Sequence, residues 1–165
     1  MNKDKLHYSR SKALHYALKY AITPNPLYRY FSIHGKGGGD CTNFTSQCLK
    51  SGGAPAVSSG KNQWWYKNNN CSISWAVASS LYWYLKINAK DHLYGVKGYE
   101  VNSPALLEVG DIIFYENIKR KIQHSVIVTS IHGSYPFISQ HTPNLLNIPY
   151  EKNWAYKTHF MKISL

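Results

Sequence analysis

The hydrophobic pattern of the sequence changes near residue 100, and this change constrains the fold more than any other feature. Before it, apolar residues recur at helical spacing in three segments: 11–21, about 41–51, and 74 to about 88. After it, short apolar runs separated by turn residues predict four strands: 111–115, 125–129, 136–141, and a last one within 156–165. Helices followed by hairpin-connected strands predict the α+β class, with N-terminal helices packed on an antiparallel β-meander.

Length and composition predict a single domain over residues 1–165. A chain of this size buries about 70% of the surface that its unfolded form exposes, and a hydrophobic fraction of 44% is typical of a globular protein. The longest apolar stretches are far shorter than the roughly 18 residues of a membrane-spanning helix. Residues 1–10 contain no apolar signal core. We therefore expect cytoplasmic synthesis, with either a non-classical export route or an origin as a domain of a longer, secreted chain.

The chain is strongly basic, with 19 Lys and Arg against 8 Asp and Glu and a net charge of +11. Such a charge attracts polyanions, among them nucleic acid and the anionic polymers of the bacterial cell wall. The basic residues are scattered and the densest run is only Lys119–Lys121, so nucleic acid is the less favoured partner. A basic, aromatic-rich binding module without catalysis is the alternative to an enzyme.

The cysteine content argues against a disulfide framework, because an odd number leaves at least one free thiol. The three cysteines are Cys41, Cys48 and Cys71. The sequence contains no Cys-x-x-Cys pair, the pattern that would indicate a zinc site. A zinc hydrolase using His124, His132 and His141 is a further alternative, but the sequence lacks the His-x-x-x-His helix motif of such enzymes. We expect no metal and no cofactor.

Cys41 is the candidate nucleophile. It follows the glycine-rich stretch 35–39 and Asp40, and it opens a predicted helix that Gly52-Gly53 ends. The partial positive charge at a helix N-terminus favours the thiolate, the reactive form, whose pKa falls to about 3.5–7.5 in such places. The Cys41 N–H, or a loop group within 35–39, would face a developing oxyanion. The alternative is a buried small hydrophobe, the role that we expect for Cys48, two turns further on.

His124 is the candidate for the base that a cysteine nucleophile requires. It begins a β-branched strand, and alternation places it with Val126 and Val128 on one face, at a core-facing edge that we expect to meet the helix N-terminus. The alternative is a surface histidine at a strand end. A group on the second ring nitrogen must fix the tautomer, and His141, at the end of the next predicted strand, is the candidate. The alternatives are Gln140, Asn144 and Asp111, the last of which opens the preceding predicted strand, where a turn-capping role is favoured.

Four further residues are expected to bind the substrate. Trp64 and Trp65 lie in segment 54–70, a predicted surface loop, where their rings would line a groove, although a core role fits them equally well. Asp40 and Asn43 flank the nucleophile. Asp40 also suits the role of a helix cap that organises the preceding loop.

Three motifs resemble those of the bacterial NlpC-type cell-wall cysteine peptidases, and they occur in the same order. Residues 40–44, Asp-Cys-Thr-Asn-Phe, resemble the Asp-Cys-Ser-Gly-Phe signature around the nucleophile of that superfamily. Residues 107–114 are similar to the Pro-Gly-Asp-Leu start of one of its strands. Residues 123–128 resemble the strand that holds its catalytic histidine.

The bacterial putative amidase domain family is similar over a longer part of the chain, from about residue 8 to 156. The segment 38–49 with Gly52-Gly53 carries the resemblance most clearly, and matching motifs follow at 64–66, 74–75, 110–111, 124–125 and 140–142. The resemblance implies a papain-like α+β fold and an amidase or peptidase that acts by acyl transfer through a thioester. Cys41 matches the nucleophile, His124 the base and His141 the third polar position. Together with the basic charge, the resemblance implies a peptide or amide bond of peptidoglycan as the substrate, and action at the cell wall.

Overall fold

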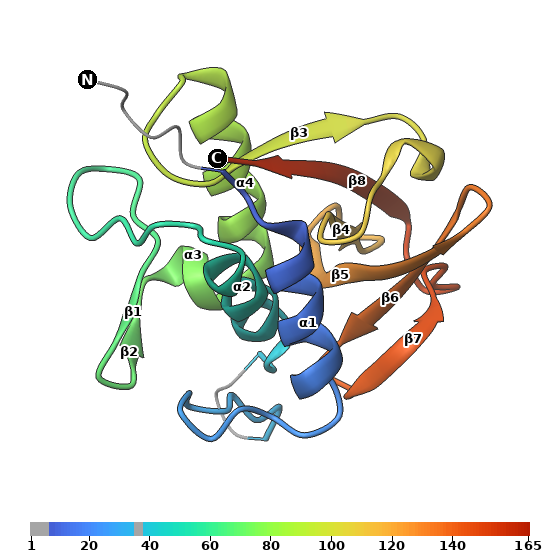
Figure 1. Ribbon diagram of the computed structural model, residues 1–165, viewed down its shortest axis with the longest axis horizontal. Helices are drawn as coiled ribbons and strands as arrows, with labels where there is room; N and C mark the ends of the chain where they lie inside the picture. Colours follow the sequence, from blue (N-terminus) through green and yellow to red (C-terminus); the bar gives the residue numbers. More distant parts are fainter. Residues whose placement is uncertain (1–6, 35–37) are drawn as a thin grey trace.

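The computed structural model describes residues 7–34 and 38–165. The described residues form four α-helices packed against one side of a six-stranded antiparallel sheet (Figure 1), which confirms the predicted α+β class. The helices are α1 (Arg10–Tyr20), α2 (Cys41–Ser51), α3 (Ile73–Ala76) and α4 (Ala78–Lys90). Further along the chain, after the four α-helices, comes a short 3-10 helix, η1 (Pro104–Leu106).

The sheet contains the predicted meander and extends it at both edges. Its strands are β3 (Lys97–Val101), β4 (Ile112–Glu116), β5 (Ile122–His132), β6 (Tyr135–Gln140), β7 (Leu145–Pro149) and β8 (Lys157–Ser164). Strands β4 to β7 pair in sequence order, whereas β8 returns to lie between β3 and β4. The papain-like assignment of this arrangement stays a prediction.

The first two helices begin and end close to the predicted residues because local signals fix their ends. The Ser9 hydroxyl accepts a hydrogen bond from the Lys12 N–H at 3.3 Å and caps α1. Gly52 ends α2, and Gly53, at φ +99°, adopts the left-handed conformation that favours glycine. The predicted third helix is instead two helices, α3 and α4. Val77 between them is extended, with φ −117° and ψ 124°.

Four short strands were not predicted. Within the predicted loop 54–70 the chain starts a small hairpin of β1 (Tyr66–Lys67) and β2 (Asn70–Cys71), separate from the main sheet. Strands β3 and β7 are the two edges of the main sheet and contain Gly98 and Pro149. Glycine and proline are turn signals in a sequence, but an edge strand tolerates both. At Gly98 a Cβ atom would lie 2.7 Å from Met161, so close packing against β8 requires the glycine.

Each face of the sheet contributes side chains to a different hydrophobic cluster. Ile112, Phe114 and Ile127 pack against the helices. The alternate residues of the same strands, among them Val126 and Val128, form a second cluster on the other face, with side chains from the strands and loops. Strand alternation therefore places Val126 and Val128 on one face, as predicted, but this face points away from the helices.

Candidate active site

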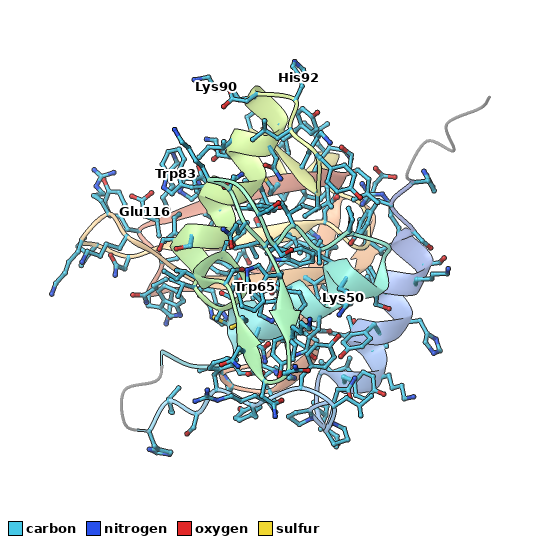
Figure 2. All side chains as sticks on the ribbon, turned by 90° about the vertical axis from the view of Figure 1, so that its left-hand side faces the viewer. Lys50, Trp65, Trp83, Lys90, His92 and Glu116 are labelled. Atoms are coloured by element: carbon cyan, nitrogen blue, oxygen red, sulfur yellow. The ribbon has the colours of Figure 1, made fainter. Side chains whose placement is uncertain are left out.

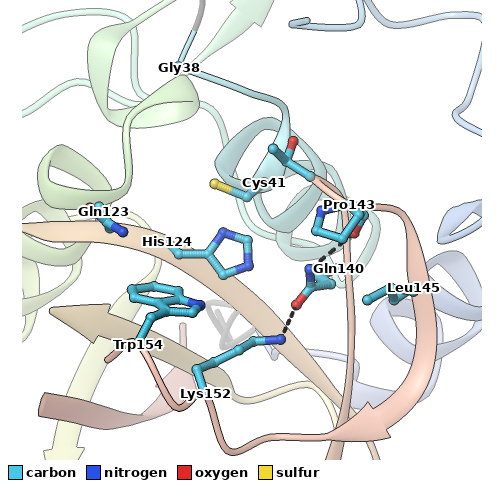
Figure 3. Close-up of a pocket in the computed structure, with 10 residues that line it drawn as sticks. Gly38, Cys41, Gln123, His124, Gln140, Pro143, Leu145, Lys152 and Trp154 are labelled. Atoms are coloured by element: carbon cyan, nitrogen blue, oxygen red, sulfur yellow. Dashed lines mark hydrogen bonds between the residues drawn. The ribbon is translucent and has the colours of Figure 1, made fainter. Parts of the chain in front are cut away.

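Cys41 lies in a cavity of about 470 Å³ at the start of α2 (Figure 3). The side chain is only 5% exposed, yet it forms part of the cavity wall. The wall is formed by Gly38, Cys41, Gln123, His124, Gln140, Thr142, Pro143, Leu145, Lys152 and Trp154. Of the residues predicted from the sequence to do chemistry, the cavity thus brings together the nucleophile, the base and one of the alternatives for the third residue.

Hydroxyl groups hold the first turn of α2 on strand β5. The Ser125 hydroxyl lies 3.0 Å from the hydroxyl of Thr42 and 3.2 Å from that of Thr45. All three side chains are buried, so these hydrogen bonds are shielded from water. Ser125 is adjacent to His124, and Thr42 is adjacent to Cys41. The contacts therefore fix the position of Cys41 relative to His124.

A β-bulge directs His124 toward the nucleophile. In the pairing of β4 with β5, Tyr115 lies opposite His124 and Glu116 lies opposite Ile122, which leaves Gln123 as an extra residue. A bulge of this kind bends the strand and re-aims the neighbouring side chains. His124 is 8% exposed, and its ring packs near the rings of Tyr115 and Trp154, at centroid distances of 5.9 and 6.2 Å. Alternation places His124 on the same strand face as Val126 and Val128, the face turned away from the helices, and the ring nevertheless shares the cavity with Cys41 at the start of α2.

The pKa of the Cys41 thiol is lowered from its ordinary value. Burial by itself raises this pKa, because a thiolate loses its hydration. A hydrogen bond from His124 and the charge of that ring act in the opposite direction and outweigh burial, with further hydrogen bonds from the Ser125 N–H and from Thr42. The N-terminal end of α2 adds a partial positive charge at the same place. The cavity thus favours a thiolate next to a histidine.

His141 does not contact His124, which corrects the predicted arrangement. Its Nδ1 lies 2.5 Å from the Asp40 carboxylate and its Nε2 lies 2.8 Å from the Tyr20 carbonyl oxygen. Both ring nitrogens are therefore occupied by partners inside the protein, and neither is available to orient a second histidine. The ring is 1% exposed and stacks on Phe44 at 4.1 Å. The same two bonded nitrogens leave His141 no free ligand atom for the zinc alternative.

Asp40 and Asn43 are also buried, at 1% exposure each, and neither lines the cavity. The Asp40 carboxylate accepts hydrogen bonds from the Phe31 N–H and the Asn43 amide, both at 2.8 Å, in addition to His141. It organises the loop before α2 as predicted, but it forms no side-chain cap on the helix. Asn43 donates a second hydrogen bond to the Arg29 carbonyl. The predicted contact of these two residues with substrate is therefore wrong, because their polar groups are occupied inside the protein.

The two tryptophans predicted to bind substrate lie elsewhere. Trp64 is fully buried in the main core, where its indole N–H donates to the Ser46 hydroxyl at 3.1 Å. Trp65 is half-buried and lines a separate hollow together with Trp83 on α4; Figure 2 shows both on the helical side of the molecule. Neither residue lines the Cys41 cavity. Of the two roles left open for Trp64, the structure shows the core role.

Among the residues of the cavity that sequence reasoning did not assign to the site are Gln123, Lys152 and Trp154. Gln123 is the extra residue of the bulge, which only the strand register reveals. Lys152 and Trp154 lie between β7 and β8, in a polar segment that no motif singled out. A basic and an aromatic residue in a surface loop carry no local signal of function. Asn144, a further alternative for the third residue, bonds instead to the Ile22 carbonyl at 3.3 Å.

The glycine-rich stretch 35–39 is described only in part, since residues 35–37 lie outside the described residues. Gly38 lines the cavity. Gly39 has φ +95°, and a Cβ atom there would lie 2.7 Å from the Thr142 side chain. Thr142 in turn accepts the Asp40 N–H at 2.8 Å. A side chain at position 39 would therefore push apart the loop and the cavity wall beside the nucleophile.

Within residues 7–34 and 38–165, no three His, Cys, Asp or Glu side chains group closely enough to hold a metal ion. In the same part of the chain, no helix is both long and apolar enough to span a bilayer.

The fold and the cavity thus define an α+β protein with a cysteine at a helix N-terminus and a histidine beside it. The chain belongs to the family described as "Putative amidase domain", which matches residues 7–164. Membership of this family indicates a hydrolase that acts on an amide.

Two curated relatives come from Bacillus subtilis (strain 168). The chain is 35% identical over 155 residues to the uncharacterized protein YhbB, covering 90% of this chain and 47% of that protein. It is 29% identical over 153 residues to the uncharacterized protein YjcM, covering 87% and 33%. The chain therefore spans about half or less of the length of these relatives. No solved structure matches the chain.

Proposed function

We propose that the protein is a cysteine amidase or peptidase that acts by acyl transfer, with Cys41 as the nucleophile and His124 as the acid and base. The observation that carries the proposal is the Cys41 thiol, whose pKa is lowered in a cavity that it shares with His124. A cysteine in an apolar interior without such partners has a raised pKa and is inert. We also propose that this arrangement of a helix, a cysteine at its start and a histidine on a strand is papain-like.

The reaction proceeds in two halves. The Cys41 thiolate attacks the amide carbonyl carbon and forms a tetrahedral intermediate. Protonated His124 gives its proton to the amine as the C–N bond breaks, which leaves a thioester on Cys41 and a neutral imidazole. Water then attacks the thioester while His124 takes its proton, the C–S bond breaks, and the acid product leaves. The thiolate and the imidazolium are thereby restored.

We propose two hydrogen-bond donors for the oxyanion. The first N–H groups of a helix have no partner within the helix, and Cys41 is the first residue of α2. Gln123 is the second donor that we propose. Its Oε1 accepts a hydrogen bond from Asn117 at 2.7 Å, which leaves the amide N–H groups to face the cavity (Figure 3).

Gln140 is the third residue that we propose in place of His141. It was an alternative from the sequence, and it lines the cavity with Cys41 and His124. Its amide donates to the Pro143 carbonyl at 3.0 Å and its Oε1 accepts from Lys152 at 2.6 Å (Figure 3). Since an amide oxygen has two lone pairs, Oε1 can accept a second hydrogen bond from the His124 ring.

The substrate that we propose is a peptide or amide bond of peptidoglycan, and the place of action is the cell wall. The resemblance to cell-wall peptidases supports this, and so does the charge of +11, which attracts anionic wall polymers.

The test is labelling of the native protein with iodoacetamide near pH 6, mapped by mass spectrometry. At this pH an ordinary thiol, with a pKa of about 8.5, is almost entirely protonated and slow. Fast modification of Cys41 alone, followed by hydrolysis of amides from purified cell walls, supports the proposal. Equal, slow labelling of all three cysteines would overturn it and favour the basic binding module.

A further inference from the structure

Lys152 places a positive charge in the cavity of the nucleophile. The side chain is half-buried, and its ammonium group lines the cavity with Cys41 and His124 (Figure 3). Its contacts are neutral: the Nζ donates to the Gln140 amide oxygen at 2.6 Å and lies 5.8 Å from the centre of the Tyr115 ring. Burial lowers the pKa of the Lys152 ammonium, because the charge is partly removed from water.

No carboxylate of the described residues compensates this charge. Some of the other partly buried basic residues pair closely with acids, such as Arg10 with Asp111 at 2.6 Å and Lys86 with Glu100 at 2.7 Å. Within residues 7–34 and 38–165, Lys152 has no acidic partner within 4.0 Å, and no Asp or Glu lines the cavity. A partly desolvated cation costs free energy unless an anion accompanies it. The cavity that contains Cys41 thus also offers a site for an anion.

We infer that Lys152 binds a carboxylate of the substrate and makes the site selective for amides that carry a carboxylate close to the bond that is cleaved. One monovalent ammonium group matches the charge of one monovalent carboxylate. The inference rests on the proposed function and names its substrate class. A purely structural Lys152, which only holds Gln140, would give no preference between charged and neutral ligands.

The experiment uses matched pairs of alkylating reagents, because these report on Cys41 before any substrate is known. Each pair contains an acid and its neutral amide. The first pair is iodoacetate with iodoacetamide, and the second is N-bromoacetylglycine with its glycinamide. The third is the analogue of the second pair with one more methylene group before the carboxylate or amide. Within a pair both reagents attack the same thiolate, so the ratio of their rates at Cys41 cancels changes in thiolate reactivity. The ratio therefore isolates the recognition of the carboxylate. Three lengths allow for the distance between the thiol and the ammonium group.

The variants are Lys152→Met, which keeps an unbranched side chain without charge, and Lys152→Arg, which keeps the charge. Lys61→Met is the control for net charge, since Lys61 is exposed and lines a different hollow. In the wild type we expect the acid-to-amide ratio of at least one pair to exceed that of free cysteine by about tenfold or more. Lys152→Met should lower this ratio about ten- to a hundredfold. Lys152→Arg should keep most of it, and Lys61→Met should leave it unchanged.

Two outcomes separate the failure of this inference from the failure of the proposed function. If the neutral amides react quickly with Cys41 but no acid is preferred, or if Lys152→Met keeps the preference, the inference is wrong and the nucleophile stands. If even the neutral amides react no faster than with free cysteine, the nucleophile is wrong and the inference is overturned with it.

Discussion

Cys41 and Cys48 lie on the same helix, two turns apart, and both are almost completely buried. Cys48 is 0% exposed and packs in the main hydrophobic cluster, where burial raises its pKa well above the ordinary value. Cys41 is 5% exposed, and burial acts on it in the same direction. There, however, the hydrogen bond and charge of His124 reverse the result. The comparison teaches that burial alone does not make a thiol inert, because the partners around the sulfur decide.

The largest expected effect comes from removing either of the two thiols that were just compared. Cys41→Ala should lower the hydrolysis of a cell-wall amide by about four orders of magnitude or more, with a change of about 1 kcal/mol or less in the free energy of unfolding. Cys48→Ala should do the reverse, keeping activity and costing about 1–2 kcal/mol through a core cavity. Turnover assays and urea unfolding of both variants provide the measurement. Residual full activity in Cys41→Ala would contradict the mechanism.

His124→Ala removes the partner that distinguishes the two cysteines. Turnover should fall by about 10²- to 10⁴-fold. Because the thiol then retains burial without its main opposing partner, its pKa should rise. Alkylation of Cys41 by iodoacetamide near pH 6 should therefore drop about tenfold or more and recover near pH 9, since the thiolate fraction changes about tenfold per pH unit below the pKa. The control is His132→Ala, an exposed histidine at the far end of the same strand. An unchanged pH profile in His124→Ala would exclude the pair.

His141→Ala sharpens the comparison by testing a buried histidine close to the same helix end. It leaves the Asp40 carboxylate without its ring partner inside the protein, which should cost about 3–5 kcal/mol of unfolding free energy. Urea unfolding measures this, and Asp91→Ala, an exposed acid at the end of α4, is the control with little change. Loss of turnover at unchanged stability would instead restore the catalytic role that the sequence predicted for His141.

Gln123→Ala should have the smallest effect. This variant separates amide hydrolysis at Cys41 from alkylation of Cys41. Without one donor to the oxyanion, amide turnover should fall about ten- to a hundredfold, at the lower end of effects known for oxyanion donors or below it. Alkylation by iodoacetamide forms no oxyanion, so its rate at Cys41 should stay unchanged. Gln63→Ala, in the other hollow, is the matched control for both assays. A parallel loss in turnover and in alkylation would mean that Gln123 acts on the thiol and not on the oxyanion.

Much of the fold was predictable because its signals are local. The caps and glycines around α1 and α2 fixed both helices to within a residue or two, and β-branched residues marked β5. The break at Val77 was missed, because one extended residue within an apolar run leaves no recognisable pattern in the sequence. The edge strands β3 and β7 were missed as well, because a glycine in a sequence indicates a turn as readily as an edge strand. In the cavity, the sequence placed Cys41 and His124, but it assigned substrate contacts to four residues that lie outside the cavity wall.

The sequence by itself determined the place of Cys41 at a helix N-terminus, because a helix start depends on the few residues around it. It also determined which residues share a strand face, because alternation is a property of the backbone. Only the tertiary structure decided that a bulge turns His124 toward Cys41, that Asp40 and His141 satisfy each other in the interior, and that Lys152 enters the cavity. These outcomes depend on strand register and on contacts between residues about 80 to 110 positions apart, which no local pattern encodes.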